Sequence, residues 1–208
     1  MLAIVDYGMG NIHSVKKALQ KLGGKVKVVT DPKELLGAEK IVLPGVGAFD
    51  DAVSVLRRRG LIAAIKKEIA KGKPFLGICL GMQLLFETSD ESPKAKGMAL
   101  LKGRVRSFPR KKSLPVPQIG WNTIDKVARL PGCQVASILK GIPDNSYVYF
   151  CHSYYPDPKD KSVIAASTNY GINFASVVCK DNIFGMQFHP EKSQAVGLRI
   201  LKNFIELC

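Results

Sequence analysis

The sequence predicts an α/β fold with a doubly wound, mainly parallel central sheet that antiparallel strands extend. Three observations predict it. Short apolar segments alternate with amphipathic stretches before Leu100, which is the pattern of repeated βα units. Glycine turns follow several apolar segments at their carboxyl ends. After Leu100 the helical pattern gives way to alternating segments and short turns, which favour antiparallel strands. A length of 208 residues suits one domain over residues 1–208.

The first half supplies the parallel strands and their helices. Asn11 follows a glycine turn and is placed to cap a helix whose apolar residues recur at helical spacing. The turn contains a Gly-x-Gly but lacks the third glycine of a dinucleotide loop, so that interpretation is rejected. The expected strands are residues 2–5, 26–29 and 41–43, and the expected later helices are residues 49–59 and 61–70.

The next segment has the pattern of a nucleophile elbow. Phe75 to Ile78 is the apolar run of a strand covered on both faces, and Gly77 and Gly81 flank Cys79 at i−2 and i+2. Residues 80–87 are expected to continue as a helix, whose N-terminal amides favour a thiolate. A lone cysteine in an apolar segment is more often a small core residue. The flanking glycines make a nucleophile the stronger interpretation here.

A glycine loop at residues 44–47 follows the third strand, at the edge where ligands bind in open α/β sheets. An oxyanion hole needs backbone N–H donors, and we expect one from Leu80 and one from this loop. By itself the loop is more often a simple strand-to-helix turn.

The second half is expected to hold strands at residues 105–108, 147–155, 162–170, 174–180 and 183–188, and a final helix with Ile200, Leu201 and Phe204 on its core face. His189 and Glu191 follow the last strand. Residues i and i+2 of an extended chain point to one side, so the carboxylate can orient the imidazole. A surface His-Pro turn is the ordinary alternative. His152 is a rival histidine, but it lacks a carboxylate at i+2 and is expected to be packed or hydrogen-bonded.

Composition bounds the function. The net charge of +14 raises a nucleic-acid hypothesis, but the basic residues are scattered and no aromatic residues interleave with them. No apolar run approaches the ~20 residues of a membrane helix, and the chain starts directly in a strand, so we expect no signal peptide and a cytoplasmic protein. The five cysteines include no C-x-x-C pair, so neither a zinc site nor a disulfide framework is indicated. No metal, cofactor, nucleic acid or membrane is expected.

The motifs resemble those of the class I (triad) glutamine amidotransferases. The resemblance rests on Gly-Ile-Cys-Leu-Gly-Met-Gln at 77–83 and Phe-His-Pro-Glu at 188–191. Residues 6–11, 43–49 and 117–122 narrow it to the glutaminase subunits of imidazole glycerol phosphate synthases, from histidine biosynthesis. The resemblance covers essentially the whole chain. It implies a flavodoxin-like fold with a nucleophile elbow, and hydrolysis of glutamine to glutamate and ammonia through a cysteine thioester.

The resemblance also implies residue roles. It implies the catalytic residues Cys79, His189 and Glu191, and the oxyanion amides of Val46 and Leu80. The residues implied to bind glutamine are Gly47, Gln83, Glu91, Ser153 and Tyr154. No cofactor is implied.

A partner is expected because a free glutaminase would waste glutamine and the chain has no synthase domain. The resemblance implies a heterodimer with a (β/α)₈-barrel cyclase that receives the ammonia, and interface residues Asn11, Trp121, Tyr149 and Lys192. Two alternatives stay open. One is a glutaminase subunit of another synthase, of the anthranilate or aminodeoxychorismate type, and the other is a non-enzymatic basic binding module.

Overall fold

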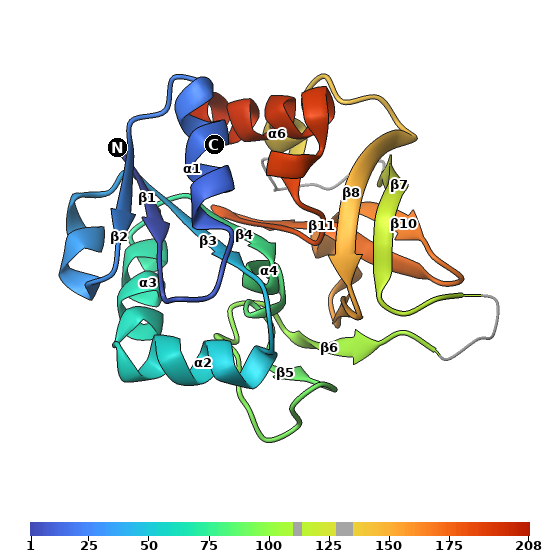
Figure 1. The fold of residues 1–208 in the computed structure, drawn as a ribbon, viewed down its shortest axis with the longest axis horizontal. Coiled ribbons are helices and arrows are strands. Elements are labelled where there is room, and N and C mark those ends of the chain that lie inside the picture. Colours follow the sequence, from blue (N-terminus) through green and yellow to red (C-terminus); the bar gives the residue numbers. More distant parts are fainter. Residues whose placement is uncertain (110–113, 128–134) are drawn as a thin grey trace.

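A nine-stranded sheet runs through the molecule (Figure 1). The computed structural model describes residues 1–109, 114–127 and 135–208. The strand order is β2-β1-β3-β4-β12-β11-β10-β7-β8. The parallel strands are β1 (Leu2–Val5), β2 (Val26–Val29), β3 (Lys40–Gly45), β4 (Phe75–Cys79) and β12 (Ile183–Met186). The antiparallel extension is β7 (Gln118–Lys126), β8 (Ser146–His152), β10 (Ile164–Asn169) and β11 (Asn173–Lys180). The predicted fold class is therefore confirmed.

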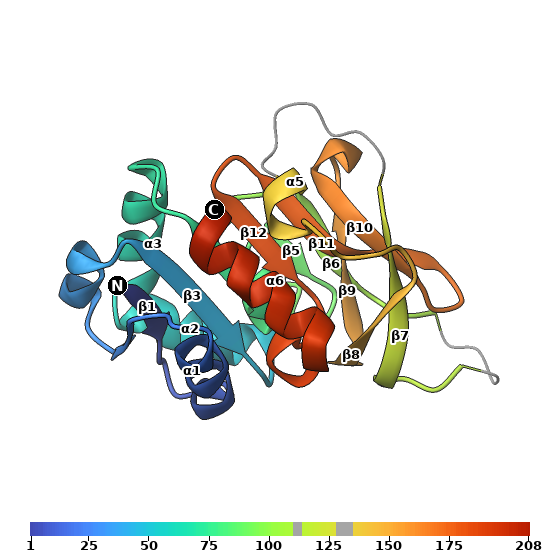
Figure 2. The same ribbon diagram turned by 90° about the horizontal axis from the view of Figure 1, so that it is seen from above.

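Helices cover both faces of the parallel part. On one face lie α1 (Ile12–Lys21) and α6 (Gln194–Leu207), and on the other lie α2 (Phe49–Arg58) and α3 (Leu61–Ala70) (Figures 1 and 2). Each layer has its own apolar core. Leu19, Leu201 and Phe204 are fully buried in the first, and Leu56 and Ile65 in the second. The buried apolar faces explain why β1, β3 and β4 are continuous apolar runs rather than alternating ones. Shorter elements are α5 (Val135–Ile138), η1 (Pro32–Gly37) and η2 (Lys161–Val163).

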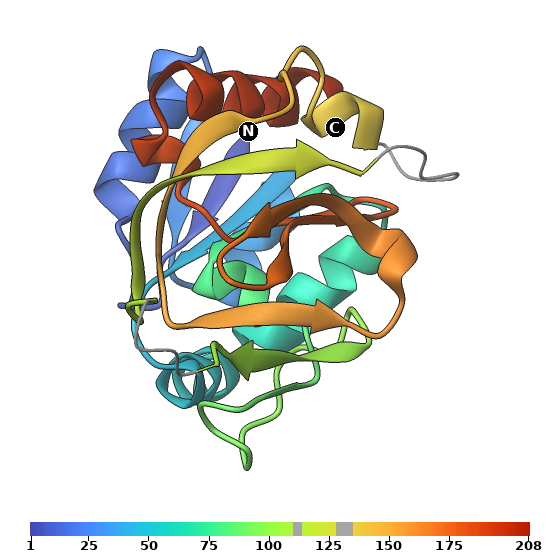
Figure 3. The same ribbon diagram turned by 90° about the vertical axis from the view of Figure 1, so that its right-hand side faces the viewer.

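A second, three-stranded sheet has the order β5-β6-β9. Its strands are β5 (Thr88–Ser89), β6 (Gly103–Ser107) and β9 (Tyr154–Pro158). Figure 3 shows it on the α2 side of the molecule, away from α6. The predicted single strand over residues 147–155 is therefore wrong. The strand is interrupted at Ser153, because β8 pairs with β7 whereas β9 pairs with β6 in the other sheet. Pattern alone cannot tell one long strand from two strands with different neighbours.

The helix after the elbow is shorter than predicted. α4 spans Leu80–Gln83, not residues 80–87. The carbonyl groups that would continue it are taken by a later segment: the N–H of Met98 donates to Leu84 at 2.8 Å, and the N–H of Leu100 donates to Leu85 at 2.9 Å. These tertiary hydrogen bonds replace the intrahelical ones, so the helix ends after one turn.

Several strand boundaries also differ from the prediction, and those of β12 and β10 have a clear physical reason. β12 ends at Met186 rather than at residue 188, since the backbone bends before His189. β10 begins at Ile164 rather than at residue 162, because Asp160 caps the preceding η2 turn and accepts the N–H of Ser162 at 2.9 Å. An aspartate that binds the backbone two residues on favours a turn over a strand.

The cysteines behave differently from one another. Cys79, Cys151 and Cys208 are free thiols. Cys179 in β11 is disulfide-bonded, which the sequence analysis did not predict. Cysteine spacing in the sequence does not report which sulfur atoms meet in the fold, so a single disulfide gives no sequence signal.

Of the helices in the described ranges, none is long and apolar enough to span a membrane.

Candidate active site

Cys79 lies at the carboxyl end of β4, at the turn into α4. Its backbone has φ 54° and ψ −110°, an uncommon conformation for a residue with a side chain. Both neighbouring glycines are required by space. A Cβ on Gly77 would lie 2.5 Å from the carbonyl oxygen of Gly81, and a Cβ on Gly81 would overlap the carbonyl oxygen of Leu43 in β3. The elbow predicted from the glycine spacing is therefore present, and it packs directly on β3.

His189 and Glu191 form a buried pair. The imidazole Nδ1 lies 2.9 Å from Oε1 of Glu191, and both side chains are almost fully buried. The predicted pairing is confirmed, but the backbone reason is different. Glu191 lies in the short 3₁₀ turn η3 (Pro190–Lys192), not in extended chain. The turn is tied down by Ser193, whose hydroxyl donates to the carbonyl of His189 at 2.6 Å.

The charges around His189 favour its protonated form. Burial by itself lowers the pKa of the imidazole, but hydrogen bonds to Cys79 and Glu191 and their negative charges outweigh it and raise the pKa of His189 to about 10. The imidazolium therefore sits between a sulfur and a carboxylate, as acyl transfer by a cysteine requires. A proton is held where it can be delivered to a leaving group.

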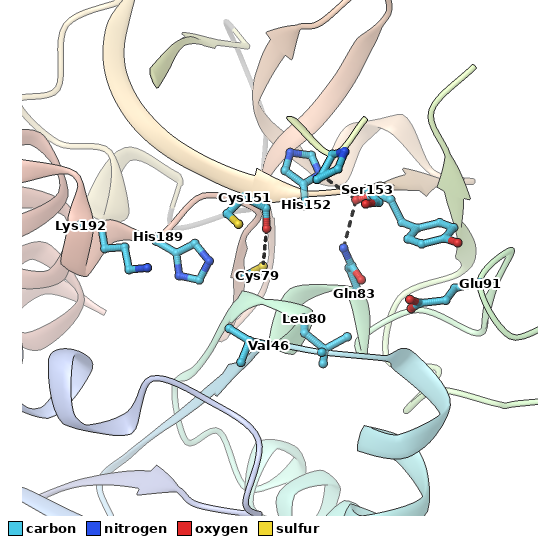
Figure 4. Close-up of a pocket in the computed structure, with 13 residues that line it drawn as sticks. Val46, Cys79, Leu80, Gln83, Glu91, Cys151, His152, Ser153, His189 and Lys192 are labelled. Atoms are coloured by element: carbon cyan, nitrogen blue, oxygen red, sulfur yellow. Dashed lines mark hydrogen bonds between the residues drawn. The ribbon is translucent and has the colours of Figure 1, made fainter. Parts of the chain in front are cut away.

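A pocket of about 310 Å³ opens beside Cys79 and His189. In Figure 4, His189 and Lys192 lie toward one end, Glu91 toward the other, and Cys79 and Gln83 between them. The residues that line it are Val46, Gly47, Cys79, Leu80, Gln83, Glu91, Pro117, Cys151, His152, Ser153, Tyr154, His189 and Lys192. Every residue that the sequence analysis assigned to oxyanion stabilisation or glutamine binding is in this set. Glu191 lies behind His189, out of the pocket.

Gln187 is the site residue that sequence reasoning missed. Its Nε2 donates to the sulfur of Cys79 at 3.6 Å, and its Oε1 accepts from Nε2 of Gln83 at 3.1 Å. Gln83 also donates to the carbonyl of Tyr154 at 3.0 Å. Gln187 is fully buried and lies two residues before His189. The available sequence signal was a glutamine between the apolar residues Met186 and Phe188. A polar side chain in a segment expected to be buried needs a hydrogen-bond partner.

Glu91 is held at the far end of the pocket. Its carboxylate accepts the N–H of Phe49, at the start of α2, at 3.0 Å. Burial raises the pKa of Glu91, the Phe49 N–H opposes this, and nearby Asp50 and Asp51 raise the pKa further. A cationic group bound beside this carboxylate would relieve the repulsion from the two aspartates.

His152 is packed and hydrogen-bonded, as predicted. Its Nδ1 lies 2.8 Å from the carbonyl oxygen of Tyr154, and its ring packs between Phe108, Phe150 and Phe174. Burial lowers the pKa of His152 to about 4. The ring is therefore neutral at pH 7, and the hydrogen bond fixes the chain where β8 passes into β9.

No group of three or more His, Cys, Asp or Glu side chains within the described ranges is placed to hold a metal ion.

Comparison with known proteins identifies the family. The sequence model for "Glutamine amidotransferase class-I" matches residues 3–207. The chain belongs to the class-I glutamine amidotransferases. Curated relatives of this amidotransferase include the protein named imidazole glycerol phosphate synthase subunit HisH of Caldanaerobacter subterraneus, which is 50% identical over 100% of this chain and 98% of its own length. The protein of the same name from Moorella thermoacetica is 48% identical over 99% of this chain and 94% of its own length. This chain therefore belongs to the HisH group of the family.

Solved structures agree on the fold of the amidotransferase. A structure titled as a glutamine amidotransferase matches with a TM-score of 0.75 and 18% identity, over 98% of this chain and 97% of that one. The structure of PurLQS from Thermotoga maritima matches with a TM-score of 0.74 and 19% identity, over 98% of this chain and 96% of that one. At these identities the likeness concerns the fold alone.

The four residues predicted to meet a partner of the amidotransferase lie in two places. Trp121 in β7 is 46% exposed and its ring meets that of Tyr149 edge-on, with centroids 6.1 Å apart. The ammonium of Lys192 lies 5.6 Å from the centre of the Tyr149 ring, within cation–π range. Asn11 lies at the start of α1, where its side chain accepts the N–H of Ser14. Their interface role stays a prediction.

Proposed function

We propose that this chain is the glutaminase subunit of an imidazole glycerol phosphate synthase, and that it supplies ammonia to a cyclase subunit in L-histidine biosynthesis. One observation carries the chemistry: Cys79 and His189 line one pocket, Glu191 holds the imidazole from behind, and the Glu91 carboxylate lies at the other end of the pocket. The names of the relatives carry the choice of synthase.

Glutamine fits the pocket by charge. Its α-ammonium group would bind the Glu91 carboxylate, and its carboxamide would then reach toward Cys79, because Glu91 and Cys79 line the same pocket. Gln83 is already held by two hydrogen bonds, so its amide presents a fixed surface to the substrate chain. Gly47, Ser153 and Tyr154 complete the lining. A preorganised polar lining of this kind favours one orientation of the substrate.

In the first half-reaction the Cys79 thiolate attacks the carboxamide carbon. A C–S bond forms and the carbonyl π electrons move to oxygen, where the N–H groups of Leu80 and Val46 stabilise the oxyanion. The tetrahedral intermediate then breaks its C–N bond. The leaving nitrogen takes a proton from the His189 imidazolium and departs as ammonia, which leaves a thioester on Cys79.

In the second half-reaction the neutral imidazole of His189 takes a proton from water. The hydroxide attacks the thioester carbon, the C–S bond breaks, and glutamate leaves with the thiolate restored. Glu191 stays ionised throughout and stabilises the imidazolium that forms again. Its burial behind the ring serves this purpose, because a charge–charge interaction is stronger away from water.

The partner completes the function. A (β/α)₈-barrel cyclase would use the ammonia to make imidazole glycerol phosphate and the aminoimidazole carboxamide ribonucleotide. Exposed Trp121 and the neighbouring ring of Tyr149, which Lys192 contacts, supply an aromatic surface of the kind enriched at interfaces. Lys192 also lines the pocket, so a protein bound there would lie at the mouth of the site.

The test is glutamate release from glutamine, by the purified chain alone and with the cyclase subunit and its ribonucleotide ligand. We expect turnover with the partner that disappears in Cys79→Ala. Trp121→Ala should weaken the complex in a sedimentation or calorimetric measurement without unfolding the free chain, because the ring is half exposed. Turnover with a different synthase subunit would favour the other-synthase alternative. A chain that is inactive in every mixture yet binds DNA in a salt-dependent manner would support the binding module instead.

A further inference from the structure

The turn at residues 7–10 packs directly against residues 44–47, which the structure shows to be the end of β3 and the start of the loop after it. The Tyr7 hydroxyl occupies the space next to Gly45, where a Cβ would overlap it. Two residues further along each segment, a Cβ on Gly47 would lie 2.9 Å from the terminal methyl of Met9. The loop therefore rests on the side chains of this turn, and glycine at position 45 leaves room for the Tyr7 hydroxyl.

The Tyr7 hydroxyl is buried without a partner. The side chain is 1% exposed, and its oxygen has no hydrogen-bond partner within the part of the chain that the structure describes. A phenylalanine would fill the same space without burying an unsatisfied polar group, which is unfavourable for folding. A hydroxyl kept at such a position therefore suggests a contact that forms only in another state of the site.

Tyr7 also lies beneath the elbow. The Cβ position on Gly45 that overlaps the Tyr7 hydroxyl is 3.0 Å from Cβ of Leu80 and 3.3 Å from the nitrogen of Gly81. Leu80 and Val46, the residue after Gly45, are the two proposed oxyanion donors. Burial and then the negative charge of Cys79 raise the pKa of the Tyr7 hydroxyl. The phenol thus keeps its proton at neutral pH and is available as a donor.

We propose that Tyr7 is a positioning residue for the oxyanion hole, whose hydroxyl donates a hydrogen bond to the carbonyl of Gly45 when the Val46 N–H faces the oxyanion. The N–H and C=O of one trans peptide point in opposite directions. Turning the Val46 N–H toward the oxyanion therefore turns the Gly45 carbonyl the other way, where the Tyr7 hydroxyl can donate a hydrogen bond to it. The hydrogen bond forms as the oxyanion forms, so it favours the transition state over the ground state.

This inference rests on the proposed glutaminase function and is tested in the same complex with its partner. In Tyr7→Phe we expect kcat for glutamine hydrolysis to fall about tenfold, KM to stay within about twofold, and the urea midpoint of unfolding to stay equal or rise. The matched control is Tyr170→Phe. The hydroxyl of Tyr170 donates to the carbonyl of Pro115 at 2.8 Å, so its loss should lower the midpoint slightly and leave kcat unchanged.

A second measurement separates the loop from the nucleophile. Alkylation of Cys79 by iodoacetamide needs the thiolate but no oxyanion hole, and it should proceed at the wild-type rate in Tyr7→Phe. Wild-type kcat in Tyr7→Phe would overturn the inference. So would an alkylation rate that falls with kcat, or a fall in kcat accompanied by a lower unfolding midpoint. A wild-type complex without glutaminase activity would instead overturn the proposed function, and this inference with it.

Discussion

Gln187 donates a hydrogen bond to the sulfur of Cys79 across 3.6 Å, and Gln83 in turn donates to Gln187 across 3.1 Å. The two amides form a short chain that begins at the carbonyl of Tyr154, on the pocket wall, and ends on the nucleophile. The fully buried Gln187 thus joins the proposed glutamine-binding wall to the proposed catalytic thiolate.

Loss of this donor should slow the chemistry. In Gln187→Leu we expect kcat to fall about tenfold with a smaller change in KM, because a hydrogen bond to a charged group contributes roughly 1.5–3 kcal/mol and this one is long. Gln187→Glu should be slower still, since it places a second negative charge beside the thiolate. Steady-state glutamate release measures both. Equal rates for the two variants would mean that the Gln187 amide does not act on Cys79.

The pH dependence of the reaction should report the His189 pair. Its imidazolium must protonate the leaving nitrogen, so kcat/KM should hold through pH 9 and decline as pH rises through about 10, the pKa of His189 in the folded protein. Glu191→Gln removes part of what raises that pKa, so the decline should move to lower pH. If kcat/KM of this variant declined at the same pH as in the wild type, Glu191 would not stabilise the positive charge of His189.

The same pair should make stability depend on pH. The pKa of His189 is raised from 6.5 to about 10 on folding, so its contribution to the free energy of unfolding is full below about pH 6.5 and is lost as pH rises through about 10. Urea unfolding of the wild type and Glu191→Gln at pH 6 and pH 10 measures this. We expect the difference between the two proteins to be larger at pH 6.

The elbow should tolerate no side chain at Gly81. A Cβ there would overlap the carbonyl oxygen of Leu43, so Gly81→Ala must push β3 away from α4. We expect a loss of about 1–3 kcal/mol in the free energy of unfolding. We also expect a loss of activity, because residues 44–47 are the end of β3 and the start of the loop after it. Gly37→Ala is the matched control, since no atom beyond its own chain neighbours lies within 4 Å of its added Cβ and its φ is negative. Equal stability of the two variants would contradict this packing.

Substrate binding should depend on Glu91. In Glu91→Gln we expect KM for glutamine to rise about ten- to a hundredfold and kcat to change less, because the carboxylate is proposed to bind the ammonium group far from the reacting carbon. Glu206→Gln, an exposed carboxylate in α6, is the control and should leave both constants unchanged. A Glu91→Gln variant whose kcat falls while KM is unchanged would remove Glu91 from substrate binding.

Local pattern was enough to predict the parts of the site whose geometry depends on neighbours in the chain. The glycines around Cys79 predict the elbow because their spacing marks a tight strand-to-helix turn, in which a Cβ on Gly77 would lie 2.5 Å from the carbonyl oxygen of Gly81. The spacing of His189 and Glu191 predicts the pair, although a 3₁₀ turn and not an extended strand brings the two side chains together. The apolar runs of β1, β3 and β4 predict a parallel sheet, because only strands buried on both faces are apolar throughout.

The tertiary structure decided whatever depends on segments far apart in sequence. The break between β8 and β9 at Ser153 depends on which strands pair. The short α4 depends on the N–H groups of Met98 and Leu100, which bind the carbonyl groups that would otherwise continue the helix. Gln187 on Cys79 and Tyr7 under Gly45 are contacts between chain segments that no spacing rule joins. The amino-acid sequence thus determined the chemical groups and their local turns, whereas long-range packing determined which atoms those groups meet.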